Sequence, residues 1–278
     1  MKYIYYHSND LDGKMSAAIA LIALKGSIEA VILCPINYGE PFSFEHIKYD
    51  DNVYVLDFCF QPFEKMIELK SRCYKLIWID HHVSALKNAE AWKFECDGIR
   101  RDGVGACQLT WDYFFDITPN PPVIVRLLAQ YDVWDFHDNR TLPFQYGMRI
   151  KETDPLSLMK YLPNNLHIHA VVDDGNIILK YTSIENKEYV QSYSFETSID
   201  GYTALAMNIG KGSSRLFDSV TREYDLFITF CRTPFNNWSV SLYSRRKDVD
   251  CSEVAKKYGG GGHFSAAGFS CEILPFKI

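Results

Sequence analysis

Three apolar segments of this chain each end at an acid or a histidine. Residues 3–6 run into His7, residues 53–56 run into Asp57, and residues 76–79 run into Asp80. Short apolar segments of this kind are typical of strands that are buried in a sheet. In a parallel sheet the carboxyl ends of neighbouring strands share one edge, where ligands bind. The pattern therefore predicts a parallel α/β fold with a polar, ligand-binding edge.

Strand and helix patterns alternate over residues 1–135, which predicts βαβ units and a mostly parallel sheet flanked by helices. Besides the first strand, this part is expected to contain strands at 29–33, 53–56 and 76–79 and helices at 14–24, 63–70, 104–115 and 122–131. Two further helices are expected at 155–162 and about 175–193. The pattern then changes, with strands expected at 202–209, 226–231 and 238–243 and a helix at 252–258.

These patterns predict a chain of two domains joined by a helix. We expect an N-terminal domain over residues 1–165, a linker helix region over 166–199 and a smaller C-terminal α/β domain over 200–278. A chain of 278 residues is long enough for two ordinary domains.

Composition narrows the classes of function. The hydrophobic fraction of 47% and the charged fraction of 23% are normal for a soluble globular protein. A net charge of −6 argues against binding to long duplex nucleic acid but not against a small anionic substrate. We expect no membrane-spanning helix and no signal peptide. The eight cysteines form no CxxC pair, which indicates reduced thiols in a cytoplasmic protein rather than structural zinc.

The strand ends and one later acid supply a candidate set of metal ligands: His7, Asp10, Asp12, Asp57, His81 and Asp132. Oxygen and nitrogen ligands without thiolates suit two Mn²⁺ or Mg²⁺ ions better than zinc. Two such ions can clamp a phosphoryl group for in-line attack. Simpler explanations exist for single residues, since Asp10 and Asp12 could cap the following helix and His81 could be a surface histidine.

The motifs together resemble a known family. The run from His7 to Gly13, then Asp57, then Asp80-His81-His82, then Asp132, resembles the four motifs of the DHH phosphoesterase superfamily. Residues 259–269 resemble the GGGHxxAAG signature of the DHHA1 domain. The chain is thus similar to the two-domain DHH/DHHA1 subfamily, which includes nanoRNases and other oligonucleotide phosphodiesterases. The resemblance implies an active-site cleft between the two domains.

The resemblance also implies roles for the candidate ligands. His7, Asp10 and Asp57 would hold one Mn²⁺ ion, and Asp12, Asp57, His81 and Asp132 would hold a second, with Mg²⁺ or Co²⁺ as substitutes. Asp57 would bridge the ions, and a water between them would be the nucleophile. Asp80 would orient the histidines, and His82 would contact the substrate phosphate. His7 precedes the paired aspartates by one residue fewer than in many relatives, so the resemblance supports its ligation least.

By the same resemblance, the C-terminal domain would bind the substrate through Gly260, Gly261, Gly262 and His263. Tyr243 stands where related enzymes carry an arginine. Two interpretations stay open: Arg245 replaces that arginine, or Tyr243 stacks on a base. Aromatic residues make up 15% of the chain, and no sequence pattern marks any of them as a stacking platform.

We therefore expect a Mn²⁺-dependent phosphodiesterase or exonuclease that acts on short oligonucleotides, linear or cyclic dinucleotides, or phosphoadenosine phosphate. A phosphoanhydride hydrolase, such as a pyrophosphatase or exopolyphosphatase, is the alternative, but the chain lacks that branch's basic SRKKQ-like stretch. A non-catalytic nucleotide-binding protein is a third hypothesis, which the intact set of acids and histidines disfavours. Neither a long duplex nor a membrane is an expected partner, and homodimer formation is left open.

Overall fold

The computed structural model describes residues 1–25, 30–115, 120–163, 167–210 and 212–278. The chain forms two compact units, Met1–Ile178 and Leu179–Ile278, and each is described by itself. The boundary lies inside one long helix, α8 (Ile168–Tyr193). The finer division at residues 165 and 199 stays a prediction, and residue 166, where the linker was expected to begin, lies outside the described residues.

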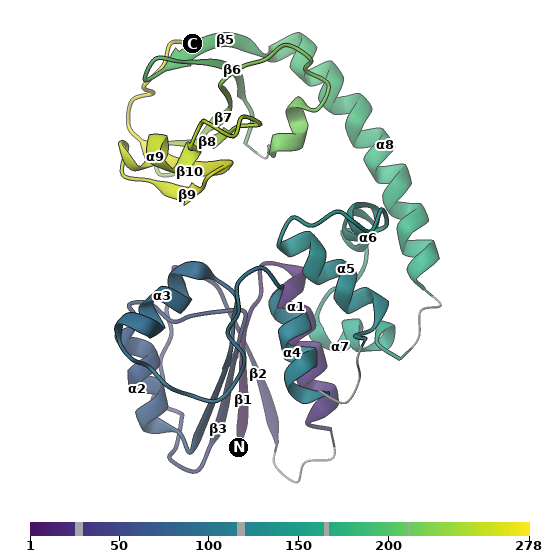
Figure 1. Cartoon of the computed structure of the whole chain (residues 1–278), viewed down its shortest axis with the longest axis vertical. Coiled ribbons are helices and arrows are strands. Elements are labelled where there is room, and N and C mark those ends of the chain that lie inside the picture. Colours follow the sequence, from purple (N-terminus) through teal and green to yellow (C-terminus); the bar gives the residue numbers. More distant parts are fainter. Residues whose placement is uncertain (26–29, 116–119, 164–166, 211) are drawn as a thin grey trace. The chain divides into compact units, whose positions relative to one another are not determined.

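The first unit is built on a parallel sheet, as expected (Figure 1). Its strands, in the spatial order β2-β1-β3-β4, are β1 (Lys2–His7), β2 (Val31–Ile36), β3 (Asn52–Leu56) and β4 (Lys75–Ile79). Glu29, the first residue of the expected second strand, lies outside the described residues. The strand order reverses direction between β1 and β3, and in open α/β sheets ligands bind outside the carboxyl ends of the strands at such a switch point.

Helices cover both faces of this sheet (Figure 1). The helices on one face are α2 (Glu64–Arg72) and α3 (Val83–Ala91), and those on the other are α1 (Leu11–Ala23) and α4 (Ala106–Phe114). Successive strand residues point to opposite faces, so Trp78 packs in the core under α2 and Ile79 packs in the core under α1. Because both faces are covered, the strands carry continuous apolar runs rather than alternating patterns, with polar residues only at the ends of β1, β3 and β4.

A second layer of helices packs on α1. It consists of α5 (Val123–Asp132), α6 (Thr141–Met148), α7 (Pro155–Leu158) and the 3₁₀ turn η1 (Met159–Tyr161). The sequence patterns did not predict α3 or α6. Ala85 is the only buried residue of α3, and α6 contains Pro143 and Gly147, which are poor helix formers. The expected helix at 155–162 is a single α-helical turn that continues as η1.

The second unit has a mixed six-stranded sheet in the order β5-β6-β7-β8-β10-β9. Its elements are β5 (Phe195–Ile199), β6 (Tyr202–Asn208), η2 (Ser214–Phe217), β7 (Leu226–Arg232), β8 (Trp238–Tyr243), α9 (Cys251–Lys256), β9 (Gly261–His263) and β10 (Ala266–Cys271). Among the described strands of this sheet, β6 and β7 pair in parallel and the other neighbours are antiparallel. The smaller C-terminal α/β unit is thus confirmed. Across the described residues of both units, every helix is too short or too polar to cross a bilayer.

Two glycines let α6 and α8 cross with their backbones in contact. A Cβ atom on Gly175 would lie 1.7 Å from the carbonyl oxygen of Pro143, and one on Gly147 would lie 1.9 Å from that of Val171. We expect Gly175→Ala to lower the free energy of unfolding by about 1–3 kcal/mol, the usual cost of overpacking. Urea denaturation measures this, with Asn176→Ala, at an exposed neighbouring position, as the control. Equal midpoints for the two variants would contradict the close crossing.

Candidate metal centre

His7 and Asp10 lie together where β1 meets α1. The Nδ1 atom of His7 is 2.6 Å from Oδ2 of Asp10 and 3.6 Å from Oδ2 of Asp57. The other oxygen of Asp10 accepts a hydrogen bond of 3.0 Å from the backbone N–H of Gly13 and so caps α1. Gly13 is needed for this close packing, because a Cβ atom there would lie 2.1 Å from the carbonyl oxygen of His7. Capping and metal ligation are therefore compatible at Asp10, one carboxylate oxygen for each.

Asp57 and Asp12 are the buried acids of the cluster, with 1% and 2% of their surface exposed. Asp57 follows β3 directly and has a φ of 55°, in the left-handed region that Asp and Asn tolerate better than most residues. Asp12 accepts hydrogen bonds from the backbone N–H groups of Ala106 (2.6 Å) and Cys107 (2.8 Å), at the start of α4. The positive end of the α4 dipole thus stabilises a carboxylate that the sequence alone did not connect with this helix.

His81 lies between three of the acids of the cluster. Its Nε2 atom lies 3.0 Å from Oδ2 of Asp132, 3.4 Å from Oδ1 of Asp57 and 3.8 Å from Oδ2 of Asp12. Asp132 is the last residue of α5, so this helix contributes a side chain to the edge formed by the strands. The structure brings together all the side chains that the sequence nominated as ligands.

Asp80 is completely buried and holds the two histidines that follow it. Its Oδ1 accepts hydrogen bonds from the backbone N–H groups of His81 (2.7 Å) and His82 (3.1 Å) and lies 2.7 Å from Nδ1 of His82. Trp78 donates from Nε1 to Oδ2 at 3.2 Å. Because Nδ1 of His82 is engaged by Asp80, its Nε2 atom is left for another partner.

The charged groups of this cluster shift one another's pKa values. Burial raises the pKa of Asp12 well above its usual range, and the neighbouring Asp57 and Asp132 raise it further. Burial lowers the pKa of His7, but the carboxylates of Asp10 and Asp57 outweigh that effect and raise it to about 10. Burial also lowers the pKa of His81, and Asp132 and Asp57 raise it to about 11. Without a cation, protons held on these histidines compensate the carboxylate charge, and binding a metal would release them.

The donor set fits divalent cations. Within the described residues, three groups each place their ligand atoms within 4.8 Å of one another: His7–Asp10–Asp57, Asp12–His81–Asp132 and Asp57–His81–His82. Oδ1 of Asp57 is buried and makes no hydrogen bond to any described residue; its nearest cationic partner is the His81 imidazole, at 3.4 Å from Nε2, so a bound cation would satisfy it better. Oxygen and imidazole ligands without a thiolate suit Mn²⁺ or Mg²⁺.

The exposed Tyr38 lies beside the centre, and no sequence pattern marked it. Tyr38 lies near His7 and His82, with ring centroids 5.7 Å and 6.3 Å apart respectively. Trp134 follows Asp132 by two residues, is 56% exposed and has a φ of 60°. The proximity of Tyr38 to the centre depends on the tertiary fold, which sequence periodicity does not report, whereas Trp134 is close to Asp132 in the sequence itself.

The candidate substrate residues of the second unit lie in and beside a hairpin. Gly261, Gly262 and His263 form β9, which pairs with β10. A Cβ atom on Gly260 would lie 2.1 Å from the carbonyl oxygen of Gly268, and Gly262 has a φ of 146°. These two glycines therefore serve close packing within the hairpin, and the phosphate-binding role of this segment stays a prediction.

Tyr243 and Arg245 make contacts inside their own unit. The Tyr243 hydroxyl donates to the carbonyl oxygen of Gly212 at 3.3 Å. Arg245 donates to the carbonyl oxygens of Val220 (3.0 Å) and Phe217 (2.5 Å) and packs over the ring of Phe227. Both side chains therefore have structural partners, and a role for either one in substrate binding stays a prediction.

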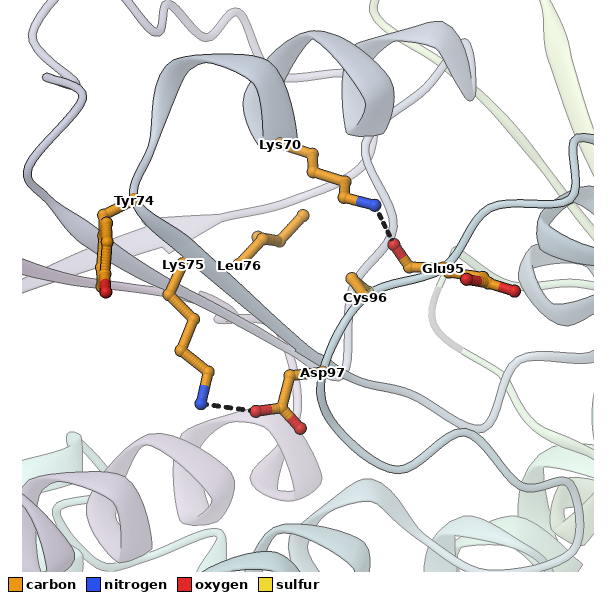
Figure 2. A pocket seen from close by; sticks show the side chains of 7 residues that line it. All are labelled: Lys70, Tyr74, Lys75, Leu76, Glu95, Cys96 and Asp97. Carbon is orange, nitrogen blue, oxygen red and sulfur yellow. Dashed lines mark hydrogen bonds and ion pairs between the residues drawn. The ribbon is translucent and has the colours of Figure 1, made fainter.

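A separate pocket lies at the opposite end of β4, and Figure 2 shows the side chains that line it. It lies around Lys75, the first residue of the strand, about 16 Å along the strand from Asp80. Its two lysines are already engaged, Lys75 with Asp97 at 2.6 Å and Lys70 with the carbonyl oxygen of Glu95. Both lysines among the described lining residues therefore already have partners.

Comparison with known proteins gives distant relatives. No family model matches the sequence. The chain is 24% identical over 301 residues to the oligoribonuclease NrnB of Bacillus subtilis, a match that covers 97% of this chain and 73% of that protein. It is also 24% identical over 250 residues to protein R106 of Acanthamoeba polyphaga mimivirus. That match covers 81% of this chain and only 55% of R106, so the chain spans about half the length of this relative.

Solved structures share the fold at low identity. A pGpG-specific phosphodiesterase, PggH from Vibrio, is 13% identical with a TM-score of 0.56, covering 98% of this chain and 93% of that one. Exonuclease RecJ bound to manganese is 13% identical with a TM-score of 0.52, covering 97% and 85%. An exopolyphosphatase-related protein from Bacteroides fragilis is 13% identical with a TM-score of 0.51, covering 96% and 86%. These likenesses establish the fold.

Replacing the shared carboxylate should separate metal binding from folding. We expect Asp57→Asn to weaken Mn²⁺ binding by more than the roughly 10- to 100-fold that loss of an outer partner causes. Metal-free stability should be kept or increased, because Asn tolerates the φ of 55° and removes a charge from the cluster. Calorimetric Mn²⁺ titration and urea denaturation measure the two effects. Asp173→Asn, on the exposed side of α8, is the control, and equal Mn²⁺ affinity in both variants would contradict the assignment.

The Asp80–His82 contact should be visible in the titration of His82. Burial lowers the pKa of His82, but the Asp80 carboxylate raises it above its ordinary value. In Asp80→Asn the amide carries no charge, so the pKa of His82 should fall and its protonated form should be lost at lower pH than in the wild type. NMR titration of the imidazole resonances measures this. Asp97→Asn, at the other end of β4, should leave the His82 pKa unchanged, and an unchanged His82 pKa in Asp80→Asn would refute the contact.

Proposed function

We propose that this chain is a divalent-metal-dependent phosphoric ester hydrolase of the DHH phosphoesterase superfamily, whose fold it has. The observation that carries the proposal is the position of Asp57. Its carboxylate belongs to two of the three groups of candidate ligands and leaves one buried oxygen without a hydrogen bond among the described residues. Asp57 would thus help to hold both cations, beside His7 and Asp10 on one side and beside His81, 3.4 Å from its Oδ1, on the other.

The residues of the centre would have different roles in holding the metal ions and in contacting the substrate. His7, Asp10 and Asp57 would hold one ion, and Asp12, Asp57, His81 and Asp132 would hold the other. When bound, the two ions supply an acidified water and a clamp for the phosphoryl group. Asp80 orients His82 through Nδ1, and protonated His82 donates from Nε2 to a phosphate oxygen of the substrate. The low exposure of Asp12 and Asp57 keeps bulk water away from these charges.

We propose manganese as the working metal. The absence of thiolate ligands in all three groups supports an ion that prefers oxygen and imidazole. The manganese-bound RecJ structure, which shares the fold, adds support from a related protein. Mg²⁺ and Co²⁺ remain substitutes to be compared in the assay.

We propose a short nucleotide as the substrate, such as a dinucleotide or an oligonucleotide of a few residues. NrnB is an oligoribonuclease and PggH is a pGpG-specific phosphodiesterase, so both distant relatives act on nucleotides. The net charge of −6 also disfavours a long polyanion. The likeness to an exopolyphosphatase-related protein keeps phosphoanhydride hydrolysis as the second candidate.

A turnover panel with Mn²⁺ tests the proposal. It compares a linear dinucleotide, RNA and DNA of two to five residues, a cyclic dinucleotide, phosphoadenosine phosphate and pyrophosphate. We expect hydrolysis of the linear dinucleotide, and a fall in kcat/KM of more than roughly 10²–10³-fold in His81→Ala. Faster turnover of pyrophosphate than of every nucleotide would favour the second candidate. Wild-type turnover by His81→Ala would rule out the two-metal site.

A further inference from the structure

A tight turn after β2 holds Tyr38 next to the candidate metal centre. Asn37 donates to the Glu40 carboxylate from its backbone N–H (3.0 Å) and from Nδ2 (2.9 Å). The backbone N–H of Glu40 in turn donates to the carbonyl oxygen of Asn37 at 3.2 Å. Gly39 has a φ of +85°, as the third residue of a type II turn requires. The turn therefore has a defined conformation.

This turn is tied to the strand end that carries His7. The Ser8 hydroxyl donates to Oδ1 of Asn37 at 3.1 Å, and the backbone N–H of Ser8 donates to the carbonyl oxygen of Ile36 at 3.1 Å. Ser8 follows His7 directly in the chain. The position of Tyr38 is thus coupled to that of a candidate metal ligand.

The Tyr38 ring itself is fixed while much of it stays exposed. It packs against the ring of the buried Phe58, with centroids 4.5 Å apart and an interplanar angle of 32°. Its hydroxyl accepts a hydrogen bond of 3.3 Å from the backbone N–H of Cys59. Even so, 43% of the residue is exposed. The ring centroids of His7 and His82 lie 5.7 Å and 6.3 Å away.

We propose that Tyr38 is a specificity-determining residue that stacks on the nucleobase attached to the phosphate held at the metal centre. The inference rests on the nucleotide substrate of the proposed function. The ring is oriented by contacts of its own, so little conformational entropy is lost on binding. Stacking on an aromatic side chain strengthens binding by roughly 5- to 150-fold per base and tolerates any base.

The position of Tyr38 also explains how the site would discriminate nucleotides from phosphoanhydrides as substrates. In this arrangement His82 contacts the phosphate, and the aromatic ring of Tyr38, whose centroid lies 6.3 Å from that of His82, is available to contact a base. A phosphate ester that carries a planar base can use both contacts. Pyrophosphate and polyphosphate have no ring and can use only the first, so Tyr38 gives them no advantage.

The test compares intact and abasic dinucleotides. One ligand has both bases, and two analogues lack the 5′ or the 3′ base in turn. In the wild type, one of the two abasic analogues, the one that lacks the base stacked on Tyr38, should have a kcat/KM roughly 5- to 150-fold lower than the intact dinucleotide. This decrease is the abasic penalty. In Tyr38→Leu that penalty should disappear, because the stacking surface is gone. Tyr38→Phe, which keeps the ring, should retain the penalty. Equilibrium binding of all three ligands is measured alongside turnover.

Two controls isolate the stacking. Tyr74→Leu removes a 72% exposed tyrosine next to the opposite end of β4 and should keep the wild-type penalty. Mn²⁺ affinity of Tyr38→Leu should match the wild type, which separates a lost stacking surface from a damaged metal centre. If Tyr38→Leu loses equal activity on intact and abasic ligands, the ring only packs against Phe58 and the inference is wrong.

The outcomes distinguish this inference from the proposed function. A persistent abasic penalty in Tyr38→Leu refutes the stacking even if the wild type hydrolyses every dinucleotide. If the wild type binds the abasic ligand more weakly than the intact one, this difference is lost in Tyr38→Leu, and the wild type hydrolyses neither ligand, the result supports the stacking and refutes the hydrolase. A wild type that neither binds nor hydrolyses the intact dinucleotide refutes both.

Discussion

Mutual repulsion among buried carboxylates is the constraint on which the rest of the first unit depends. Asp12 and Asp57 are almost wholly buried, and Asp10 and Asp132 complete an acidic cluster around them. The protein offsets this charge with the amide groups at the start of α4 and with histidines whose pKa values are raised to about 10 and 11. A site that holds so much negative charge in so little water is prepared for divalent cations.

The parallel sheet makes this concentration of charge possible. β1, β3 and β4 are hydrogen-bonded neighbours that run in the same direction, so His7, Asp57 and Asp80 emerge at the same edge. Helices on both faces bury the strands and leave the carboxyl edge as the place where polar side chains collect. Ligands built on rigid strand ends keep their geometry better than ligands on long loops.

The success and the failure of sequence-based prediction have physical causes. The strands of the first unit were predicted because burial on both faces leaves a continuous apolar run in the sequence. α3 was missed because it buries one residue, so its sequence has no apolar stripe, and α6 was missed because it includes a proline and a glycine, which are poor helix formers. The amide partners of Asp12 were equally invisible, since Ala106 lies 94 residues away in the chain.

The sequence by itself determined the parallel fold and nominated the ligands, because strand burial and the residues at strand ends are both local in sequence. The tertiary structure decided how those ligands group, with Asp57 shared and Asp80 holding His82. It alone singled out Tyr38 among the aromatic residues. The place of that ring depends on Cys59, 21 residues further along the chain, and on Phe58, and contacts between separate segments leave no periodic pattern in a sequence.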